Sequence, residues 1–139
     1  GMDSRLFKNL RGEDGLAYQI GSGYSPNVLK GHFLTYIGTN PENIQTATDK
    51  MLAEINRIKT EFVSQTELQE AKDKILGQYI LSQETNLEKA TTLGWYEATG
   101  RGFNFKPEYE KLINSVTESD IIDVANRIFN NCYIKVTVD

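Results

Sequence analysis

The spacing of hydrophobic residues along the chain changes between a period of two and a period of about 3.6. Residues 16–24 and 31–38 alternate, with aromatic and β-branched side chains on both faces, and this pattern predicts two strands. The segment 25–30 between them has the composition of a turn, so the two strands should form a hairpin. Residues 133–138 alternate once more and predict a third strand.

Most of the remaining chain has helical spacing. The predicted helices cover residues 4–10, 41–58, 65–83, 86–99, 107–113 and 118–129. Their candidate N-terminal caps are Asn40 (before Pro41), Ser64 (with Glu67), Thr85 (with Glu88) and Thr117. Residues 11–15 have turn composition. The order of short helix, hairpin, four or five helices and final strand predicts an α+β fold, with the antiparallel sheet packed against the helices.

Composition narrows the class of protein. The 139 residues are 39% hydrophobic and 24% charged, which is ordinary for one globular domain, and we expect a single domain over residues 1–139. With 15 Lys and Arg against 19 Asp and Glu the net charge is −4, so we expect no nucleic-acid partner. No apolar stretch approaches the roughly 18 residues that a membrane helix needs, so we expect no membrane partner.

Two singletons limit the chemistry further. The chain has one cysteine, Cys132, and one histidine, His32. A disulfide framework, a multi-cysteine zinc site and any motif with two histidines are therefore excluded. We expect no metal site in this chain, and His32 is interpreted as a surface or partly packed side chain. A single free cysteine favours a reducing compartment such as the cytoplasm.

Other candidate motifs have simpler explanations. The glycine-rich stretch Gly21-Ser22-Gly23 lies inside the predicted hairpin, whereas a phosphate loop is followed by a helix. A bulge or a close backbone approach is the favoured interpretation. Glu67 and Glu70 are three residues apart on a predicted helix, as many solvated carboxylate pairs are, and Glu67 already belongs to a capping box.

The segment from Leu10 to Tyr18 is more specific. Arg11 follows a predicted helix end, and Tyr18 lies at the beginning of a predicted strand. The turn between them could therefore bring both side chains to the entrance of one pocket. Arginine offers a planar fork of donors for carbonyl or carboxylate groups, and tyrosine offers one hydroxyl on a rigid ring. By spacing alone, a surface arginine and a sheet tyrosine remain the simpler interpretation, because no pocket is visible.

Residues 4–18 (SRLFKNLRGEDGLAY) resemble the second-domain signature of the pitrilysin and insulin-degrading-enzyme family. These are the inverzincin zinc metallopeptidases, which include the mitochondrial processing peptidases. Further matches at 31–43, 67–72 and 116–125 extend the resemblance over nearly the whole chain. The family's usual Arg-Glu-Lys-x-Gly reads Arg-Gly-Glu-Asp-Gly here, although the spacing from Arg11 to Tyr18 is preserved.

The resemblance implies a division of labour. Family members pair a catalytic domain, which carries the inverted H-x-x-E-H zinc motif, with a similar domain that lacks it, and an extended peptide binds between the two. By residue match, Arg11 and Tyr18 would bind the peptide backbone, and Tyr18 would also help stabilise the carbonyl under attack in trans. Zinc is expected in the parent or partner catalytic domain. This chain lacks the motif and should be inactive alone.

The resemblance also suggests that the chain is the back half of a metallohydrolase-like domain. Gly1 and Met2 are then either internal residues or a cleavage scar. A half domain would have an unpaired sheet edge, so we expect self-association, with a homodimer that completes the sheet as one form. Two alternatives stay open: an inactive relative that acts as a partner subunit or assembly protein, and an unrelated α+β ligand-binding module.

Overall fold

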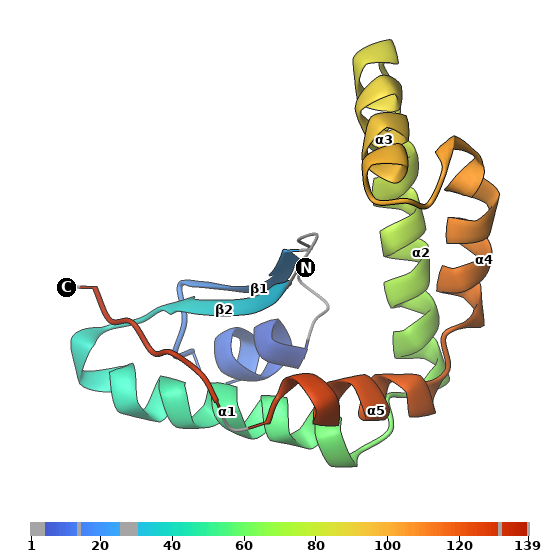
Figure 1. The fold of residues 1–139 in the computed structure, drawn as a ribbon. Coiled ribbons are helices and arrows are strands. Elements are labelled where there is room, and N and C mark those ends of the chain that lie inside the picture. The colour runs from blue at the N-terminus through green and yellow to red at the C-terminus, as the bar shows by residue number, and fades with distance from the viewer. Residues whose placement is uncertain (1–4, 14, 26–30, 131, 139) are drawn as a thin grey trace. The chain divides into compact units, whose positions relative to one another are not determined.

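The computed structural model describes residues 5–13, 15–25, 31–130 and 132–138 (Figure 1). Its elements are η1 (Phe7–Glu13), β1 (Gln19–Ser25), β2 (His32–Gly38), η2 (Pro41–Asn43), α1 (Ile44–Thr60), α2 (Gln65–Leu81), α3 (Asn86–Ala98), η3 (Phe103–Phe105), α4 (Lys106–Ser115) and α5 (Glu118–Ile128). The predicted α+β class with an antiparallel sheet is confirmed. The predicted turn at 25–30 falls mostly on residues 26–30, which lie outside the described residues.

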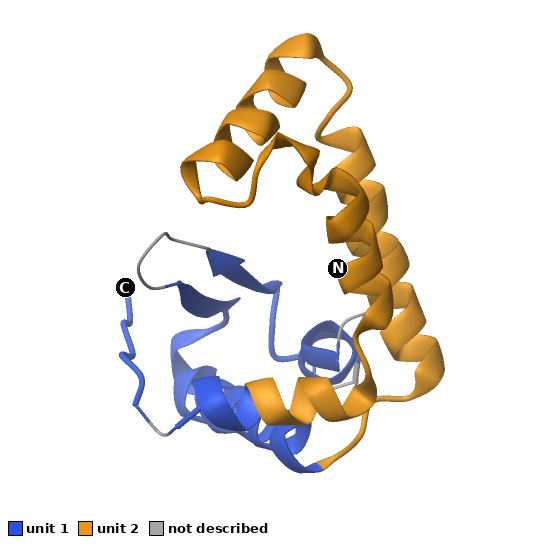
Figure 2. Ribbon diagram, turned by 45° about the vertical axis from the view of Figure 1, so that its right-hand side comes forward, with its two compact units in different colours: residues 1–60, 125–139 blue, residues 61–124 orange. Residues whose placement is uncertain are grey.

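The chain divides into two compact units (Figure 2). Unit 1 comprises residues 1–60 and 125–139, and unit 2 comprises residues 61–124. Helix α5 contributes to both units, because its last turn belongs to unit 1. Each unit has its own small group of buried apolar side chains, and each is described by itself below.

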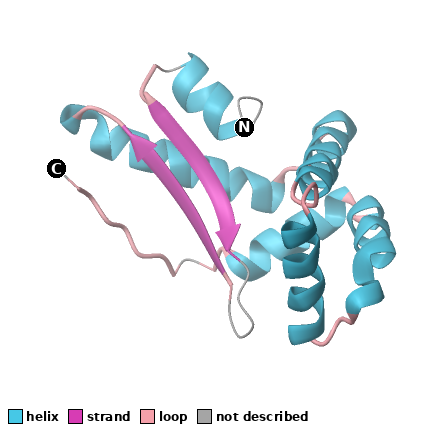
Figure 3. Ribbon diagram, turned by 90° about the horizontal axis from the view of Figure 1, so that it is seen from above, coloured by secondary structure: helices cyan, strands magenta, loops and turns pink. Residues whose placement is uncertain are grey.

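Unit 1 is built on the β1–β2 hairpin, whose strands lie side by side in Figure 3. The strands are antiparallel, with Gln19 opposite Gly38 at one end and Ser25 opposite His32 at the other. The Thr35 hydroxyl adds a hydrogen bond of 3.1 Å to the carbonyl of Gly21 across the pair. The two strands predicted from alternation are therefore confirmed, with the first beginning three residues later than expected.

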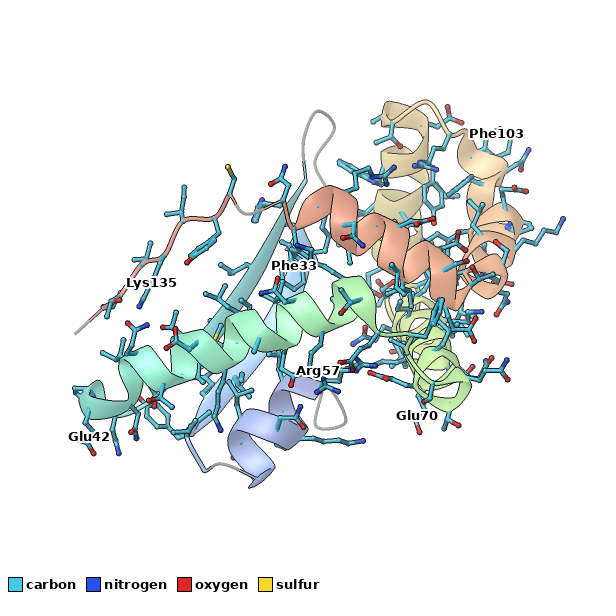
Figure 4. All side chains as sticks on the ribbon, turned by 90° about the horizontal axis from the view of Figure 1, so that it is seen from below. Phe33, Glu42, Arg57, Glu70, Phe103 and Lys135 are labelled. Carbon is cyan, nitrogen blue, oxygen red and sulfur yellow. The ribbon has the colours of Figure 1, made fainter. Side chains whose placement is uncertain are left out.

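Helix α1 supplies much of the core of unit 1. Its apolar stripe buries Ala47 and Met51, as helical spacing predicts. Asn40 is extended and Pro41 occupies the first turn of η2, but the Asn40 side chain makes no capping bond. Phe33 of β2, which Figure 4 labels, meets Phe129 edge to face at 5.0 Å between ring centroids. This contact holds the end of α5 to the sheet.

Unit 2 consists of helices whose starts follow the predicted caps. Ser64 Oγ accepts a hydrogen bond of 3.1 Å from the Glu67 nitrogen at the start of α2. Thr85 and Glu88 form a reciprocal capping box at the start of α3. Both caps satisfy backbone donors that a helix N-terminus otherwise leaves unpaired.

An aromatic cluster joins the helices of unit 2. The Tyr96 hydroxyl donates to the Tyr79 hydroxyl at 3.0 Å, and the Tyr79 and Tyr109 rings lie 4.5 Å apart. Phe105 meets Tyr96 edge to face at 5.1 Å. Burial, together with the bond to Tyr79, raises the pKa of Tyr96 above its ordinary value. The cluster ties α2, α3 and α4 together.

The predicted end of the first helix and the predicted turn at residues 11–15 both need correction. The helix predicted over residues 4–10 continues through Glu13 as the π-helix η1, so Arg11 lies in its last turn rather than in a turn beyond it. The left-handed turn comes at Gly15, with φ of 62°, a conformation that glycine adopts without strain. Arg11 stacks on Phe7 one turn earlier, and this contact supports the extra turn despite Gly12.

The predicted third strand over residues 133–138 is not formed among the described residues, where the sheet contains β1 and β2 alone. Residues 132–138 are drawn as a loop in Figure 3. Ile134, Val136 and Val138 are 92%, 77% and 88% exposed. Alternation alone does not make a strand, because each backbone donor and acceptor needs a neighbouring strand to pair with.

Candidate functional site

The helix that carries Arg11 is anchored to α1. Leu10, the residue before Arg11, is 1% exposed. Directly before Leu10, Asn9 Nδ2 donates to Glu54 Oε1 at 2.7 Å, and Arg57 Nη1 donates to the same oxygen at 3.0 Å. Figure 4 shows Arg57 on the side of α1 that faces η1. Burial and charge-assisted hydrogen bonding thus fix the base from which Arg11 projects.

Arg11 itself is exposed and rests on an aromatic ring. Its guanidinium carbon lies 4.9 Å from the centroid of the Phe7 ring, four residues earlier in η1. Such a contact holds a guanidinium plane in place while its outer N–H groups stay open to water. The arrangement leaves a planar donor fork available to an acceptor group such as a peptide carbonyl.

Tyr18 is held by the sheet. Ala17 before it is buried, whereas the Tyr18 side chain is 67% exposed. The Tyr18 nitrogen donates to the carbonyl of Gly38 at 3.1 Å, which extends the hairpin by one residue beyond β1. The ring lies against Gly38, since a Cβ built at that glycine would stand 2.6 Å from Tyr18 Cε2.

The connection between the two residues is closed by backbone hydrogen bonds. Leu16 donates to the carbonyl of Leu10 at 3.0 Å, and the Thr39 hydroxyl donates to the carbonyl of Leu16 at 2.6 Å. The structure therefore brings the backbone beside Arg11 to Leu16, two residues before Tyr18. No hydrogen bond joins the two side chains among the described residues, and each rests on its own support.

The remaining residues singled out from sequence lie apart from this pair. His32 and Cys132 are exposed. Gly21 lies in a regular stretch of β1, without a bulge, and what approaches it closely is the Tyr36 ring rather than another backbone. Within the described part of the chain, no group of three or more histidine, cysteine or acidic side chains could hold a metal ion. The described histidine, cysteine and acidic side chains therefore do not fit a zinc ion.

A hollow in unit 2 was not anticipated from sequence. It has a volume of about 700 Å³ and lies where the start of α2 meets the α4–α5 junction. Its lining includes Gln65, Leu68, Gln69, Lys72, Asn114 and Thr117. Lys72 Nζ donates to the Asn114 carbonyl at 2.9 Å across it. Helix ends from distant parts of the chain form this hollow, and no local sequence signal reports such a meeting.

Residues 1–75, which are more than half of the chain, match the family described as the peptidase M16 inactive domain. The chain belongs to this family. The resemblance drawn from residues 4–18 is thereby confirmed, because the matched segment contains that signature. The family is that of the inactive domain of zinc protease-like proteins, and the sequence contains no H-x-x-E-H motif.

The curated relatives of this M16 inactive-domain chain are longer proteins. A protein of Rickettsia bellii named as an uncharacterized zinc protease is 33% identical over 131 residues, which are 94% of this chain and 32% of the relative. One of Bacillus subtilis with the same description is 26% identical over 132 residues, or 95% of this chain and 32% of the relative. The chain spans about a third of the length of the curated relatives it matches.

Solved structures share the fold of the M16 inactive-domain chain. A peptidase M16 inactive domain from Pseudomonas fluorescens superposes with a TM-score of 0.82 at 21% identity, over 94% of this chain and 31% of that one. A protease from Helicobacter pylori superposes with a TM-score of 0.78 at 23% identity, over 93% of this chain and 31% of that one.

Of the helices that the structure describes, none has the length and apolar character to cross a membrane.

Proposed function

We propose that this chain is the substrate-positioning, non-zinc part of a zinc-dependent endopeptidase, and that residues 1–139 form part of a larger peptidase domain. The observation that carries the proposal is the setting that Arg11 and Tyr18 have in common. Each is an exposed side chain placed directly after a buried residue, Leu10 or Ala17. A side chain that must meet a substrate needs this combination of a fixed backbone and an open tip.

Tyr18 would donate its hydroxyl proton in a hydrogen bond to the carbonyl oxygen of the peptide bond under attack. Negative charge develops on that oxygen in the transition state, and a donor already in place stabilises it without reorganising. A tyrosine ring has few torsions, so little entropy is lost when the hydroxyl engages. The 67% exposure of Tyr18 leaves its hydroxyl available.

Arg11 would hold the peptide backbone on the same side. Its fork of N–H donors suits main-chain carbonyl groups, and stacking on Phe7 fixes the plane of that fork. An extended peptide bound in this way is recognised through its backbone rather than through one side chain. The metal site would be supplied by another domain or chain, as the zinc protease names of the relatives suggest.

The test uses the complete gene product that contains this chain, together with the zinc-bearing chain if the two are encoded separately. Hydrolysis of an extended peptide is measured for Tyr18→Phe and Arg11→Ala. We expect Tyr18→Phe to lower kcat by about 10²-fold, the usual scale for losing one oxyanion donor. Arg11→Ala should mainly raise KM, because the fork binds ground state and transition state alike.

Two matched controls come from the same chain. Tyr24→Phe changes another exposed tyrosine of the hairpin, and Arg101→Ala removes another guanidinium stacked on an aromatic ring, 4.8 Å from the centroid of Phe105. Neither control should change kcat or KM. If Tyr18→Phe leaves kcat unchanged and Arg11→Ala leaves KM unchanged, the inactive partner-subunit or assembly role replaces this proposal.

A further inference from the structure

Three tyrosine rings of the hairpin lie against glycines, and one of them is the Tyr24 ring, which lies against Gly31. The Tyr18 ring lies against Gly38, and the Tyr36 ring lies against Gly21. A Cβ built at Gly38 would stand 2.6 Å from Tyr18 Cε2, and one built at Gly21 would stand 2.7 Å from the Tyr36 hydroxyl oxygen. Carbon atoms in contact are about 3.5–4.0 Å apart, so any side chain at either glycine would collide with a ring.

Backbone conformation does not explain these glycines. Among the described residues, the glycines with positive φ are Gly15, Gly100 and Gly102. Gly38 and Gly21 lie in the regular register of the hairpin, where the extended backbone accepts residues with side chains. Glycine weakens a strand because it has no side chain to pack and more entropy to lose. The close approach of the ring is therefore what the glycine allows.

We infer that Gly38 is the positioning residue for Tyr18, setting where its hydroxyl stands for the reaction. The inference rests on the proposed role of Tyr18. The Tyr18 side chain is held at its base by the bond from its nitrogen to the Gly38 carbonyl, and its ring is seated on the same glycine. One residue thus fixes both the backbone and the ring, and leaves the rest of the side chain open to a substrate.

Gly38→Ala should move the Tyr18 ring while the hairpin stays folded. The added methyl group requires the ring to shift by roughly 1 Å to restore ordinary contact. The colliding atoms belong to a mostly exposed side chain, so the ring gives way rather than the sheet. Displacements of about 1 Å can cost about 10²-fold in rate when a group must meet a reacting atom.

The position of the ring is measured first, by NMR of the 139-residue chain with labelled tyrosine. Gly38→Ala should shift the ring signals of Tyr18 and leave those of Tyr36 in place. Gly21→Ala, the matched control on the same sheet, should shift the ring signals of Tyr36 and leave those of Tyr18 in place. This readout needs no activity. Unmoved Tyr18 signals in Gly38→Ala overturn the inference whatever the catalytic role of Tyr18.

Kinetics of the complete gene product then test the link to the reaction. Gly38→Ala should lower kcat by about 10²-fold with little change in KM, and Gly21→Ala should leave both unchanged. Because Gly38 acts through the Tyr18 hydroxyl, the double variant with Tyr18→Phe should be no slower than Tyr18→Phe alone. Losses that multiply in the double variant overturn the inference, as would an impaired Gly21→Ala.

The two proposals fail in different ways. If Tyr18→Phe lowers kcat and Gly38→Ala does not, the inference about Gly38 is wrong and the proposed function stands. If Tyr18→Phe leaves kcat unchanged, the catalytic role of Tyr18 is wrong, and the assignment of Gly38 to the reaction is overturned with it.

Discussion

The backbone nitrogen of Leu16 donates a hydrogen bond of 3.0 Å to the carbonyl oxygen of Leu10. This bond closes the loop between the helix that carries Arg11 and the strand that follows Tyr18. It spans Gly15, whose φ of 62° lets the chain turn back sharply. Two residues that are seven positions apart in the sequence are thereby placed on neighbouring, anchored pieces of backbone.

Leu10→Ala should loosen this anchor more than any exposed substitution nearby. Leu10 is 1% exposed, and deleting a buried leucine side chain costs about 2–5 kcal/mol in free energy of unfolding, from lost burial and the cavity that remains. Urea denaturation of the chain measures this loss. Leu34→Ala, at a position 60% exposed on β2, should cost less than about 1 kcal/mol. Equal costs at the two positions would contradict the anchoring role of Leu10.

Zinc should not bind to the isolated chain with one-to-one stoichiometry. A zinc site needs three or four ligands, and the chain has one histidine and one cysteine. Equilibrium dialysis followed by elemental analysis provides the measurement. The chain should also fail to cleave peptides by itself. Stoichiometric zinc, or cleavage that a chelator abolishes, would place a metal centre in this chain and contradict the assignment of that centre elsewhere.

The alternating segment 133–138 should promote self-association at micromolar concentration. Its apolar side chains are largely exposed, and an unpaired extended segment readily pairs with another chain. Light scattering should give a mass above that of the monomer, and Val136→Lys should lower it by placing charge on the apolar side. Lys135→Ala, at the residue that Figure 4 labels on this segment, should not lower it. A sharp monomer for the unaltered chain would refute the prediction.

Acid should weaken the start of α3. Hydrogen bonds from Thr85, first from its backbone and then from its hydroxyl, hold the pKa of Glu88 below its ordinary value. A lowered pKa means that the contribution to stability is present above the ordinary carboxyl value and is lost as pH falls through the lowered one. The free energy of unfolding, measured between pH 5 and about pH 2, should depend less on pH in Glu88→Gln than in the unaltered chain. Glu84→Gln should match the unaltered chain.

Alkali should weaken unit 2 through its tyrosine cluster. Burial, followed by the hydrogen bond with Tyr79, raises the pKa of Tyr96, and burial likewise raises the pKa of Tyr109. A raised pKa means that stability is complete below the unfolded value, about 10, and is lost as pH rises above it. Denaturation between pH 8 and about pH 11.5 should show this decline.

Tyr96→Phe separates the two contributions of that hydroxyl. The variant loses the bond to Tyr79, so it should be less stable at pH 8, yet its stability should fall less steeply toward high pH. Tyr133→Phe, at a position 64% exposed, should keep the slope of the unaltered chain. An unaltered slope in Tyr96→Phe would show that this hydroxyl does not titrate with folding.

Gly38→Ala should keep or raise the stability of the hairpin and at the same time lower the reaction rate. Alanine in a strand is more stable than glycine by about 0.5–1 kcal/mol, so Gly38→Ala should not weaken the hairpin once the Tyr18 ring has moved. A stabilised but slower variant is the pattern expected when a glycine serves a site rather than the fold.

Local signals in the sequence determined most of the elements. Helical spacing, the Ser64 and Thr85 caps and the alternation of residues 31–38 each depend on contacts within a few residues, so they predict α2, α3 and β2 without any knowledge of the fold. The family signature over residues 4–18 likewise lies in one stretch. Arg11 and Tyr18 could be singled out because their identity and spacing are local properties.

Tertiary structure alone decided how that pair is supported. The bond from Asn9 to Glu54 joins residues 45 positions apart, and the contact of the Tyr18 ring with Gly38 joins residues about 20 positions apart. No local pattern encodes such long-range contacts. The segment 133–138 makes the same point in reverse. Its alternation is that of a strand, but a strand exists only where a partner supplies the other half of each hydrogen bond.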